Sequence, residues 1–363
     1  MNRGTKIKLK QLGVIVLSWM MMGLLMTLYD HFVLLMGKVQ DSDAGYSFLM
    51  SAARNVGAGL VGSVIGGSIL VFYVNVKCQE RSQAYTFLIV SGSFIFIAVL
   101  IITLIGLIFI PIETGRPLAD PLTKAAFRNF LTDRAHIKDV MAWAFVVTIT
   151  KMLLQVSSKF GQADFWNILR GKYNRPQEEK KIFMFLDLNS STAIAEKLGD
   201  EMYHAFLRDF FADITTPILN NRGSVYQYVG DEVVIAWNYE DGKQNGHCVQ
   251  CFFDMKAHID RLRNKYLDRY GFVPSFKAGI HCGSVIAGEV GILKRDITYS
   301  GNVLNTTSRI LGKCSELKEE LIVSADLLAE LCLMKNYMLR PLGAIKLRGR
   351  EKEILLNALR PAA

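Results

Sequence analysis

The chain has 363 residues, 51% of them hydrophobic, and a formal net charge of +9. Its length is enough for one large domain or two ordinary ones. The first 160 residues contain long uncharged runs, whereas the remainder carries charges throughout, and this uneven distribution excludes a wholly soluble chain. A membrane part followed by a globular part is therefore predicted.

Four stretches are apolar enough, at about 20 residues each, to cross a bilayer as helices. They are Val14–Met36, Val56–Val76, Phe87–Ile110 and Val140–Val156. No small-residue cleavage site follows the first stretch, so we do not interpret it as a signal peptide. The third has no polar face, which argues against a helix buried in a soluble core.

Basic residues predict the orientation of these spans, because cytoplasmic segments carry an excess of lysine and arginine. The segment before the first span and the segment after the fourth are both basic. Their residues are Arg3, Lys6, Lys8 and Lys10, and then Arg170, Lys172, Arg175, Lys180 and Lys181. An even number of spans places both segments on one side. We therefore expect a multi-pass protein of the cell (inner) membrane with a cytoplasmic N-terminus and globular part. This topology accounts for much of the positive charge, so no nucleic-acid partner is invoked.

Glycines and charges inside the spans suggest how the helices pack. The Gly62-x-x-x-Gly66 spacing allows close helix approach, either within the bundle or at a dimer seam. Asp30 and His31 lie near the outer end of the first span, and Lys151 lies inside the fourth. Such charges are costly in a bilayer, so an ion pair, a sensing site or snorkelling would each fit them.

Two connectors complete the organisation of the chain. Between the third and fourth spans, Pro121–Asp139 reads as an amphipathic helix that begins at its proline. After the fourth span, a helical and charged linker contains Pro176, which is expected to stop the helix. The predicted domains are a transmembrane part (1–160), the linker (161–180) and a globular domain (181–360).

The globular part alternates short strands with amphipathic helices, and its strands read as mostly antiparallel, so we predict an α+β sandwich. Glycines 283, 288 and 291 are expected to surround a loop. The predicted strands are Lys181–Asp187, Ser224–Val229, Glu232–Trp237, Phe276–Cys282, Ile297–Tyr299 and Leu321–Ser324, with two short strands at the end. The predicted helices are Thr192–Leu198, Asp200–Asn220, Asn245–Tyr270, Val303–Gly312 and Ala325–Leu333.

Two aspartates end β-type runs in this part of the chain. Asp187 follows the first predicted strand, and Asp231 occupies the turn of the predicted hairpin. Two carboxylates at the same end of a sheet can hold a pair of hard cations, which in turn bind the oxygens of a nucleotide triphosphate. A partner motif follows at Asn305 and Arg309, which lie four residues apart and therefore on one face of a helix.

A second pattern, His247-Cys248-Val-Gln-Cys251, resembles a metal-binding motif. It lies in a predicted helix and has no second ligand pair at suitable spacing. We therefore interpret the two cysteines as helix-packing residues. His281, within the glycine-rich segment, is likewise expected to be a packed strand residue.

Four segments in order resemble the signature of class III nucleotidyl cyclases. They are Phe185–Thr192, Tyr228–Glu232, Gly279–Gly288 and Gly301–Arg309. The resemblance covers residues 181–360, and it implies a ferredoxin-like α/β sandwich. It also implies a head-to-tail homodimer with active sites between the protomers, which converts a nucleoside triphosphate into a cyclic nucleotide and pyrophosphate.

The resemblance assigns roles to the residues at one side of such a site. Asp187 and Asp231 would hold two Mg²⁺ or Mn²⁺ ions, with the Leu188 carbonyl as an added ligand. The ribose 3′-hydroxyl would attack the α-phosphate in line while pyrophosphate leaves. Backbone N–H groups at a helix start would bind phosphate, and these belong to Asn189, Ser190, Ser191 and Thr192.

The partner chain would supply the other side of the site. Asn305 would orient the ribose, and the Arg309 guanidinium would stabilise charge that develops at the α-phosphate. The alternative for Arg309 is a surface salt bridge. Arg348 and Arg350 stand where the family usually has a triphosphate-binding lysine, and the choice between them stays open.

Two positions of the family motif read the purine, and here they hold Gln227 and Thr298. Threonine at the second position is typical of bacterial adenylate cyclases. Gln227 departs from the lysine of adenylate cyclases and from the glutamate of guanylate cyclases. Its amide offers both a donor and an acceptor, so it can match adenine or, rotated, guanine. Because no carboxylate is present for guanine, ATP is the favoured substrate.

The sequence thus predicts a membrane-bound adenylate cyclase that makes cyclic AMP. One alternative is a guanylate cyclase that makes cyclic GMP. Another is a catalytically silent receptor that binds nucleotide without turnover, although the two aspartates, Asn305 and Arg309 are all present. A diguanylate cyclase would lack the Asn-x-x-x-Arg helix, and the four spans show no polar pathway for a transporter.

Overall fold

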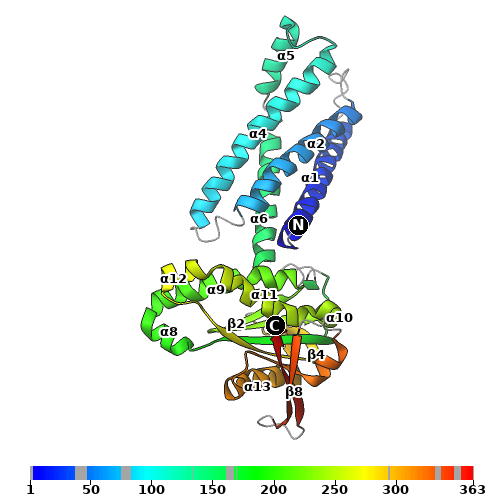
Figure 1. Cartoon of the computed structure of the whole chain (residues 1–363). Coiled ribbons are helices and arrows are strands. Elements are labelled where there is room, and N and C mark those ends of the chain that lie inside the picture. The colour runs from blue at the N-terminus through cyan, green and yellow to red at the C-terminus, as the bar shows by residue number, and fades with distance from the viewer. Residues whose placement is uncertain are drawn as a thin grey trace. The chain divides into compact units, whose positions relative to one another are not determined.

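The structure, a computed structural model, divides the chain into two compact units, Thr5–Phe165 and Trp166–Ala363 (Figure 1). The residues that it describes are 3–36, 47–74, 83–133, 135–160, 167–168, 170–292, 295–331, 337–346 and 353–362.

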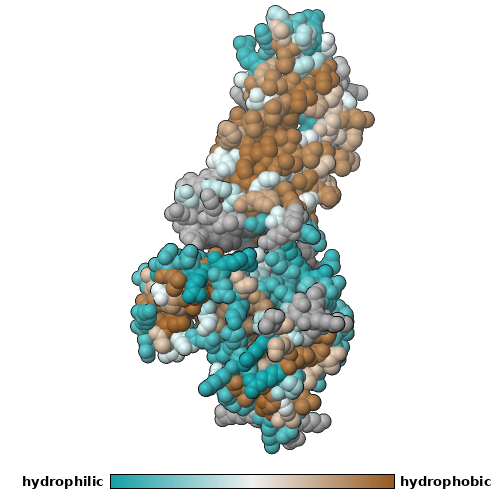
Figure 2. All heavy atoms as spheres, viewed as in Figure 1, coloured by the Kyte–Doolittle hydropathy of each residue, from teal (hydrophilic) through white to brown (hydrophobic). Residues whose placement is uncertain are grey.

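Long apolar helices make up the N-terminal unit. Four helices of the described residues are long and apolar enough to cross a membrane, at Arg3–Met36, Phe48–Val74, Gly92–Thr114 and His136–Ser157. These positions agree with the four predicted spans, and hydrophobic side chains dominate the surface of this unit in Figure 2. The elements are α1 (Arg3–Met36), α2 (Phe48–Gly62) with its π-helical continuations η1 (Ser63–Gly67) and η2 (Ile69–Val74), α4 (Gln83–Thr114), α5 (Pro121–Leu131) and α6 (Ala135–Phe160).

The sequence predicts one helix over Pro121–Asp139, but the structure has two helices in this segment. Helix α5 starts at Pro121, where the Asp120 carboxylate caps it by accepting from the Leu122 N–H. It ends at Thr132, whose φ of −97° and ψ of 4° leave the helical region. The residues from Ala135 onward belong to α6. The non-helical backbone at Thr132 therefore separates the segment into two helices.

Glycine allows α1 and α2 to pack backbone against backbone. A Cβ atom at Gly23 would lie 2.4 Å from the Asn55 carbonyl oxygen, and one at Gly59 would lie 2.7 Å from the Trp19 carbonyl oxygen. Any larger residue would force the two helices apart. This is the close approach that small residues permit in membrane bundles.

An ion pair joins α1 to α6 at one end of the bundle. The Lys138 Nζ lies 2.7 Å from the Asp30 Oδ1. Of the three roles considered for Asp30, an ion pair is therefore the one that the structure contains. Both side chains are partly exposed in the isolated chain, so the pair orders the helix ends more than it stabilises the fold.

The C-terminal unit is built on one eight-stranded sheet of order β2-β3-β1-β4-β6-β8-β7, with β5 paired to β4. Only the β4–β6 pair is parallel among its paired strands. This confirms the predicted α+β class. The strands are β1 (Gln177–Leu188), β2 (Ser224–Val229), β3 (Glu232–Asn238), β4 (Phe276–Val290), β5 (Asp296–Ser300), β6 (Leu321–Ser324), β7 (Tyr337–Ile345) and β8 (Ile354–Pro361).

Helices cover both faces of this sheet (Figure 1). Alternate β1 residues point to opposite faces, so Met184 packs beneath α9 and α11 while Phe183 packs on the side of α13. The helices are α8 (Ser191–Leu198), α9 (Asp200–Asn220), α10 (Tyr239–Lys243), η3 (Gln244–Gly246), α11 (His247–Arg261), α12 (Arg263–Tyr270), α13 (Asn302–Leu317) and α14 (Ala325–Glu330).

The predicted glycine-rich loop is wrong for Gly283 and Gly288, which lie inside strand β4. Their missing side chains serve packing instead. A Cβ atom at Gly283 would lie 2.7 Å from the Val303 side chain, and one at Gly279 would lie 2.5 Å from the Leu311 backbone nitrogen. The glycines therefore let α13 lie directly on β4.

The predicted helix Asn245–Tyr270 is divided into η3, α11 and α12. A break falls at Leu262, whose φ of −91° and ψ of 12° end α11. Cys248 and Cys251 are fully buried in α11, as the packing interpretation requires. Burial raises the pKa of Cys248 to about 12, which disfavours the thiolate that binds metals.

Candidate active site

Asp187 lies near the end of β1, the strand between β3 and β4. Its backbone is paired with Glu232 on one side and Lys277 on the other. The Lys277 Nζ lies 2.8 Å from the Asp187 Oδ2, and both side chains are largely buried. The strand pairing therefore fixes the Asp187 carboxylate beside the Lys277 ammonium group at the end of β1.

Asp231 reaches the same edge from the hairpin between β2 and β3. Gly230, with a φ of +63°, and Asp231 form the turn that joins Val229 to its partner Glu232. The left-handed conformation suits glycine at this position. The neighbouring Asp231 raises the pKa of the Asp187 carboxyl, so the structure places the two predicted carboxylates near each other.

Their proximity changes the acidity of Asp187. Burial raises the pKa of its carboxyl, Lys277 partly offsets this rise, and the neighbouring Asp231 raises the pKa further. Like-charged carboxylates in contact disfavour full ionisation of both unless a cation neutralises them. The pair therefore favours the binding of positive charge.

The donor set fits hard divalent cations. No group of three or more His, Cys, Asp or Glu residues that could cage a metal occurs among the described residues. A site with two carboxylates leaves several coordination positions for water and phosphate oxygens, as Mg²⁺ sites commonly do. Leu188, whose carbonyl is the predicted added ligand, is the last residue of β1 and directly follows Asp187, and its role stays a prediction.

Three further residues lie around the two aspartates, and the sequence did not indicate a role for them at the site. They are Glu232, Tyr203 and Lys277. Burial and then the charges of Asp187 and Asp231 raise the pKa of Glu232 to about 7. Burial, followed by the same two charges, raises the pKa of the Tyr203 hydroxyl. Glu232 is adjacent to Asp231 in the motif, whereas the positions of Tyr203 and Lys277 follow only from helix packing and strand register.

The predicted phosphate-binding segment follows β1. The Asn189 N–H donates to the Ser275 carbonyl at 2.9 Å, and its side-chain amide donates to the Ser275 hydroxyl at 3.1 Å. The Asn189 N–H is therefore already used to hold the loop, which corrects its expected role. Ser190 is left-handed, with a φ of +57°. Its carbonyl accepts the first helical bond of α8, from Ile194, so the N–H groups of Ser191 and Thr192 precede the helical ladder.

Asn305 and Arg309 lie on one face of α13, as predicted from their spacing. Asn305 is exposed and Arg309 is half-buried. Among the described residues, no hydrogen bond or ion pair joins either of them to Asp187 or Asp231.

The sheet register places α13 along β1. Val303, at the start of α13, lies against Gly283, which is paired with Lys181, six residues before Asp187. Leu311, just beyond Arg309, lies against Gly279, which is paired with Phe185, two residues before Asp187. The helix therefore runs along β1 toward Asp187, and the register by itself does not divide the predicted site between two chains.

The two positions expected to read the purine lie on β2 and β5, which are paired with β3 and β4 and not with each other. Gln227 is exposed on β2, just after a bulge, and Thr298 is half-buried on β5. The adjacent residues Tyr226 and Tyr299 pack with ring centroids 4.9 Å apart, and the Tyr299 N–H donates to the Tyr226 hydroxyl at 3.4 Å. These tyrosines fix the two strand segments side by side.

The remaining sequence assignments have different outcomes. Arg348 and Arg350 lie outside the described residues. His281 is buried, and its Nδ1 lies 2.8 Å from the Ser324 hydroxyl, which agrees with a packed strand residue.

The family model described as "Adenylate and Guanylate cyclase catalytic domain" matches residues 174–357. This match spans half of the chain and contains both aspartates, Asn305 and Arg309. The chain belongs to this family.

Several named cyclases are similar to this chain. "Adenylate cyclase 2" of Rhizobium meliloti (strain 1021) is 35% identical over 207 residues, which are 57% of this chain and 57% of that protein. "Adenylate cyclase 1" of the same strain is 27% identical over 172 residues, 46% of this chain and 25% of that protein. The matches thus span well under two thirds of these relatives. A solved bacterial light-regulated adenylyl cyclase shares the fold, with a TM-score of 0.53 and 20% identity over 63% of this chain and 67% of that chain.

Proposed function

We propose that the protein is a membrane-bound adenylate cyclase that converts ATP into 3′,5′-cyclic AMP and pyrophosphate. The placement of Asp187 and Asp231 at the same end of the sheet carries this proposal, because Asp187 is paired with Glu232, the residue that follows Asp231. Membership of the cyclase family and the adenylate cyclases among its relatives support it.

Asp187 and Asp231 would hold two Mg²⁺ or Mn²⁺ ions together with the Leu188 carbonyl. Such ions, when bound, would acidify the ribose 3′-hydroxyl and neutralise triphosphate charge. The N–H groups of Ser191 and Thr192 would bind phosphate at the start of α8. Positioning and charge stabilisation would then supply most of the rate.

The site would be completed in a homodimer. Asn305 of a second copy would orient the ribose, and its Arg309 would stabilise charge at the α-phosphate. Within the described ranges of the chain, no hydrogen bond or ion pair joins either residue to Asp187 or Asp231 of its own chain, and this supports the arrangement. Exposed apolar side chains on β2 and β4 offer a surface for the second copy, and they are Tyr228, Val229, Ile286 and Val290.

ATP is the favoured substrate because Gln227 and Thr298 place no carboxylate at the purine. Guanine presents an N1–H and a 2-amino group, which a carboxylate would accept. A glutamine can present its carbonyl to the adenine amino group and its NH₂ to adenine N1. Guanylate cyclase activity is the second candidate, since a rotated amide would match guanine.

The proposed location is the cell (inner) membrane, with residues 1–160 as the transmembrane part and 161–180 as a linker. The N-terminus and the cyclase domain (181–360) would be cytoplasmic, where nucleoside triphosphates are found. The four long apolar helices support membrane insertion, and the flanking basic residues support the orientation.

An assay of the purified full-length protein with ATP and GTP offered separately tests the proposal. We expect cyclic AMP with Mg²⁺ or Mn²⁺, loss of turnover with a chelator, and recovery when the ion returns. A preference for GTP would support the alternative. Absence of turnover with both nucleotides would support a silent nucleotide-binding receptor.

A further inference from the structure

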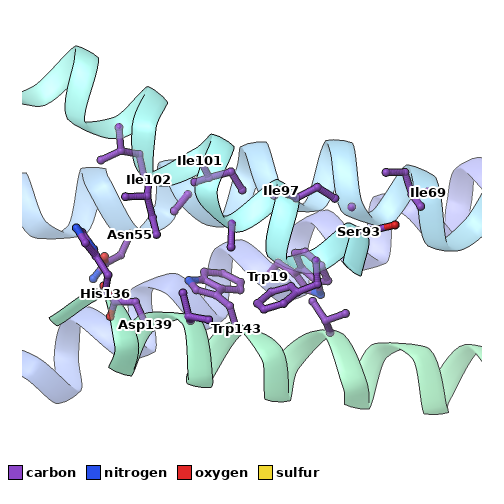
Figure 3. A pocket seen from close by; sticks show the side chains of 18 of the residues that line it. Trp19, Asn55, Ile69, Ser93, Ile97, Ile101, Ile102, His136, Asp139 and Trp143 are labelled. Atoms are coloured by element: carbon purple, nitrogen blue, oxygen red, sulfur yellow. The ribbon is translucent and has the colours of Figure 1, made fainter. Parts of the chain in front are cut away.

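A cavity of about 170 Å³ lies inside the N-terminal helix bundle. Residues of α1, α2 with its π-helical continuations, α4 and α6 line it, and its middle is bounded by Trp19 and Trp143 (Figure 3). Most of the wall is aliphatic, including Leu70, Ile97 and Ile101. Apolar cavities of this size bind apolar molecules.

Glycines create this space. Gly62 and Gly66 both line the cavity, and a Cβ atom at Gly66 would meet the Trp19 ring at 3.6 Å and Ile97 at 3.8 Å. The Gly62-x-x-x-Gly66 pattern therefore faces the bundle interior, which is one of the two arrangements considered from the sequence. Side chains at these positions would point into the cavity rather than toward a second bundle.

One end of the cavity is polar. Asn55, His136 and Asp139 gather there in Figure 3, opposite the end marked by Ile69, and Arg54 and Asp133 also line the cavity. Hydrogen bonds hold this end in place. The Asn55 amide donates to the Thr27 hydroxyl at 2.9 Å, and the His136 Nε2 lies 2.5 Å from the Phe130 carbonyl oxygen.

The polar end carries charges of both signs. The Asp133 and Asp139 carboxylates and the Arg54 guanidinium line it, and Lys138, whose Nζ lies 3.8 Å from Asp139, is paired more closely with Asp30 at 2.7 Å. An anionic head would face two carboxylates, and a cationic head would face the Arg54 guanidinium and would have to be desolvated inside the bundle. A neutral head that forms hydrogen bonds loses nothing to repulsion, and the Asn55 oxygen and the Arg54 donors could pair with it.

The volume of the cavity limits the length of the apolar tail that a bound molecule could place in it. A 150 Å³ cavity accommodates benzene, so 170 Å³ encloses roughly six carbon atoms. A two-chain phospholipid is too large, and its phosphate would meet the aspartates. We propose that this cavity is a binding site for a neutral single-chain amphiphile, an alcohol, ketone or amide, with its head at Asn55 and Arg54 and its tail between the tryptophans.

Quenching of tryptophan fluorescence tests the site without relying on cyclase activity. The full-length protein in phosphatidylcholine vesicles is titrated with 5-bromo-1-pentanol, which fits the volume of the cavity, because bromine quenches tryptophan on contact. We expect saturable quenching above the linear background of probe dissolved in the bilayer. 5-Bromopentanoate should bind roughly tenfold more weakly, because its charge must be desolvated beside the carboxylates.

Two glycine variants form a matched pair for this titration. Gly66→Leu should fill the cavity and abolish saturable quenching, whereas Gly57→Leu should bind as the unmodified protein does, since a Cβ atom at Gly57 meets nothing within 4 Å. Unbrominated 1-pentanol should reverse the quenching in the unmodified protein, a readout that needs no variant to fold. Linear quenching in the unmodified protein would overturn the proposal, as would saturable quenching in a folded Gly66→Leu variant, equal binding of the anionic probe, or failure of pentanol to compete.

Discussion

At the scale of single residues, the proposed chemistry depends on two neighbouring carboxylates. Asp187 is fixed by its strand and by Lys277, and Asp231 is fixed by the tight turn at Gly230. The placement of both residues at one end of the sheet was foreseen, because each ends a β-type run in the sequence, and their shared role in metal binding stays a prediction. Lys277 and Tyr203 were not foreseen, because their neighbourhood depends on strand register and on the packing of α9.

Replacement of either aspartate tests the proposed metal pair. Asp187→Ala and Asp231→Ala should each lower turnover with ATP at least about 10³-fold, because metal ions contribute several kcal/mol of transition-state stabilisation. Asp268→Ala, at an exposed position of α12, serves as the matched control and should retain activity. Circular dichroism should show that all three variants fold. Normal turnover in a folded Asp187 or Asp231 variant would contradict the two-metal account.

Substitution at Gln227 tests how the purine is read. Gln227→Glu should raise the ratio of GTP to ATP turnover by roughly tenfold, because the carboxylate can accept both the guanine N1–H and its 2-amino group. The measurement is kcat/KM for each nucleotide. Gln177→Glu, at the exposed start of β1, should leave the ratio unchanged. An unchanged ratio in Gln227→Glu would remove this position from base recognition.

At the scale of elements, β4 and α13 act as one packed unit. The sequence predicted both elements but ended β4 at Cys282, because Gly283 and Gly288 were interpreted as loop residues. The structure continues the strand to Val290, since glycine there makes room for Val303 and for Pro176. Glycine is common in loops and also permits close packing within strands, and a single sequence does not distinguish these two uses. Strand β6, an apolar run without glycine, was predicted with its observed bounds.

A pair of glycine substitutions measures this packing. Gly279→Ala should lower the free energy of unfolding by about 2 kcal/mol, because its Cβ would lie within 2.5 Å of the α13 backbone. Gly312→Ala is the control within α13. Its Cβ meets nothing within 4 Å, so alanine should stabilise the helix by about 0.5–1 kcal/mol. Hydrogen exchange of the α13 amides reports both changes. Equal protection in the two variants would show that the close contact does not hold α13 on the sheet.

At the scale of the whole molecule, the chain joins a bundle of membrane-type helices to a cyclase domain. The four spans were predictable because apolar runs of this length with few charges are typical of transmembrane helices. The cavity inside the bundle was not, because it depends on which glycines face Trp19. The predicted triphosphate-binding arginines, Arg348 and Arg350, lie outside the described residues and stay predictions. In the part of the chain that the structure describes, Asn305 and Arg309 make no bond to the aspartates, which supports the proposal that the site is shared by a pair of chains.

Complementation between two inactive variants tests this central claim most directly. Arg309→Ala and Asp231→Ala are co-expressed as full-length chains, and cyclic AMP formation is measured for each variant alone and for the mixture. A mixed pair retains one complete site, so random assortment should restore up to about a quarter of normal activity. The double variant in one chain, paired with itself, should stay inactive. If the mixture shows no activity although mixed pairs form, the shared site is contradicted.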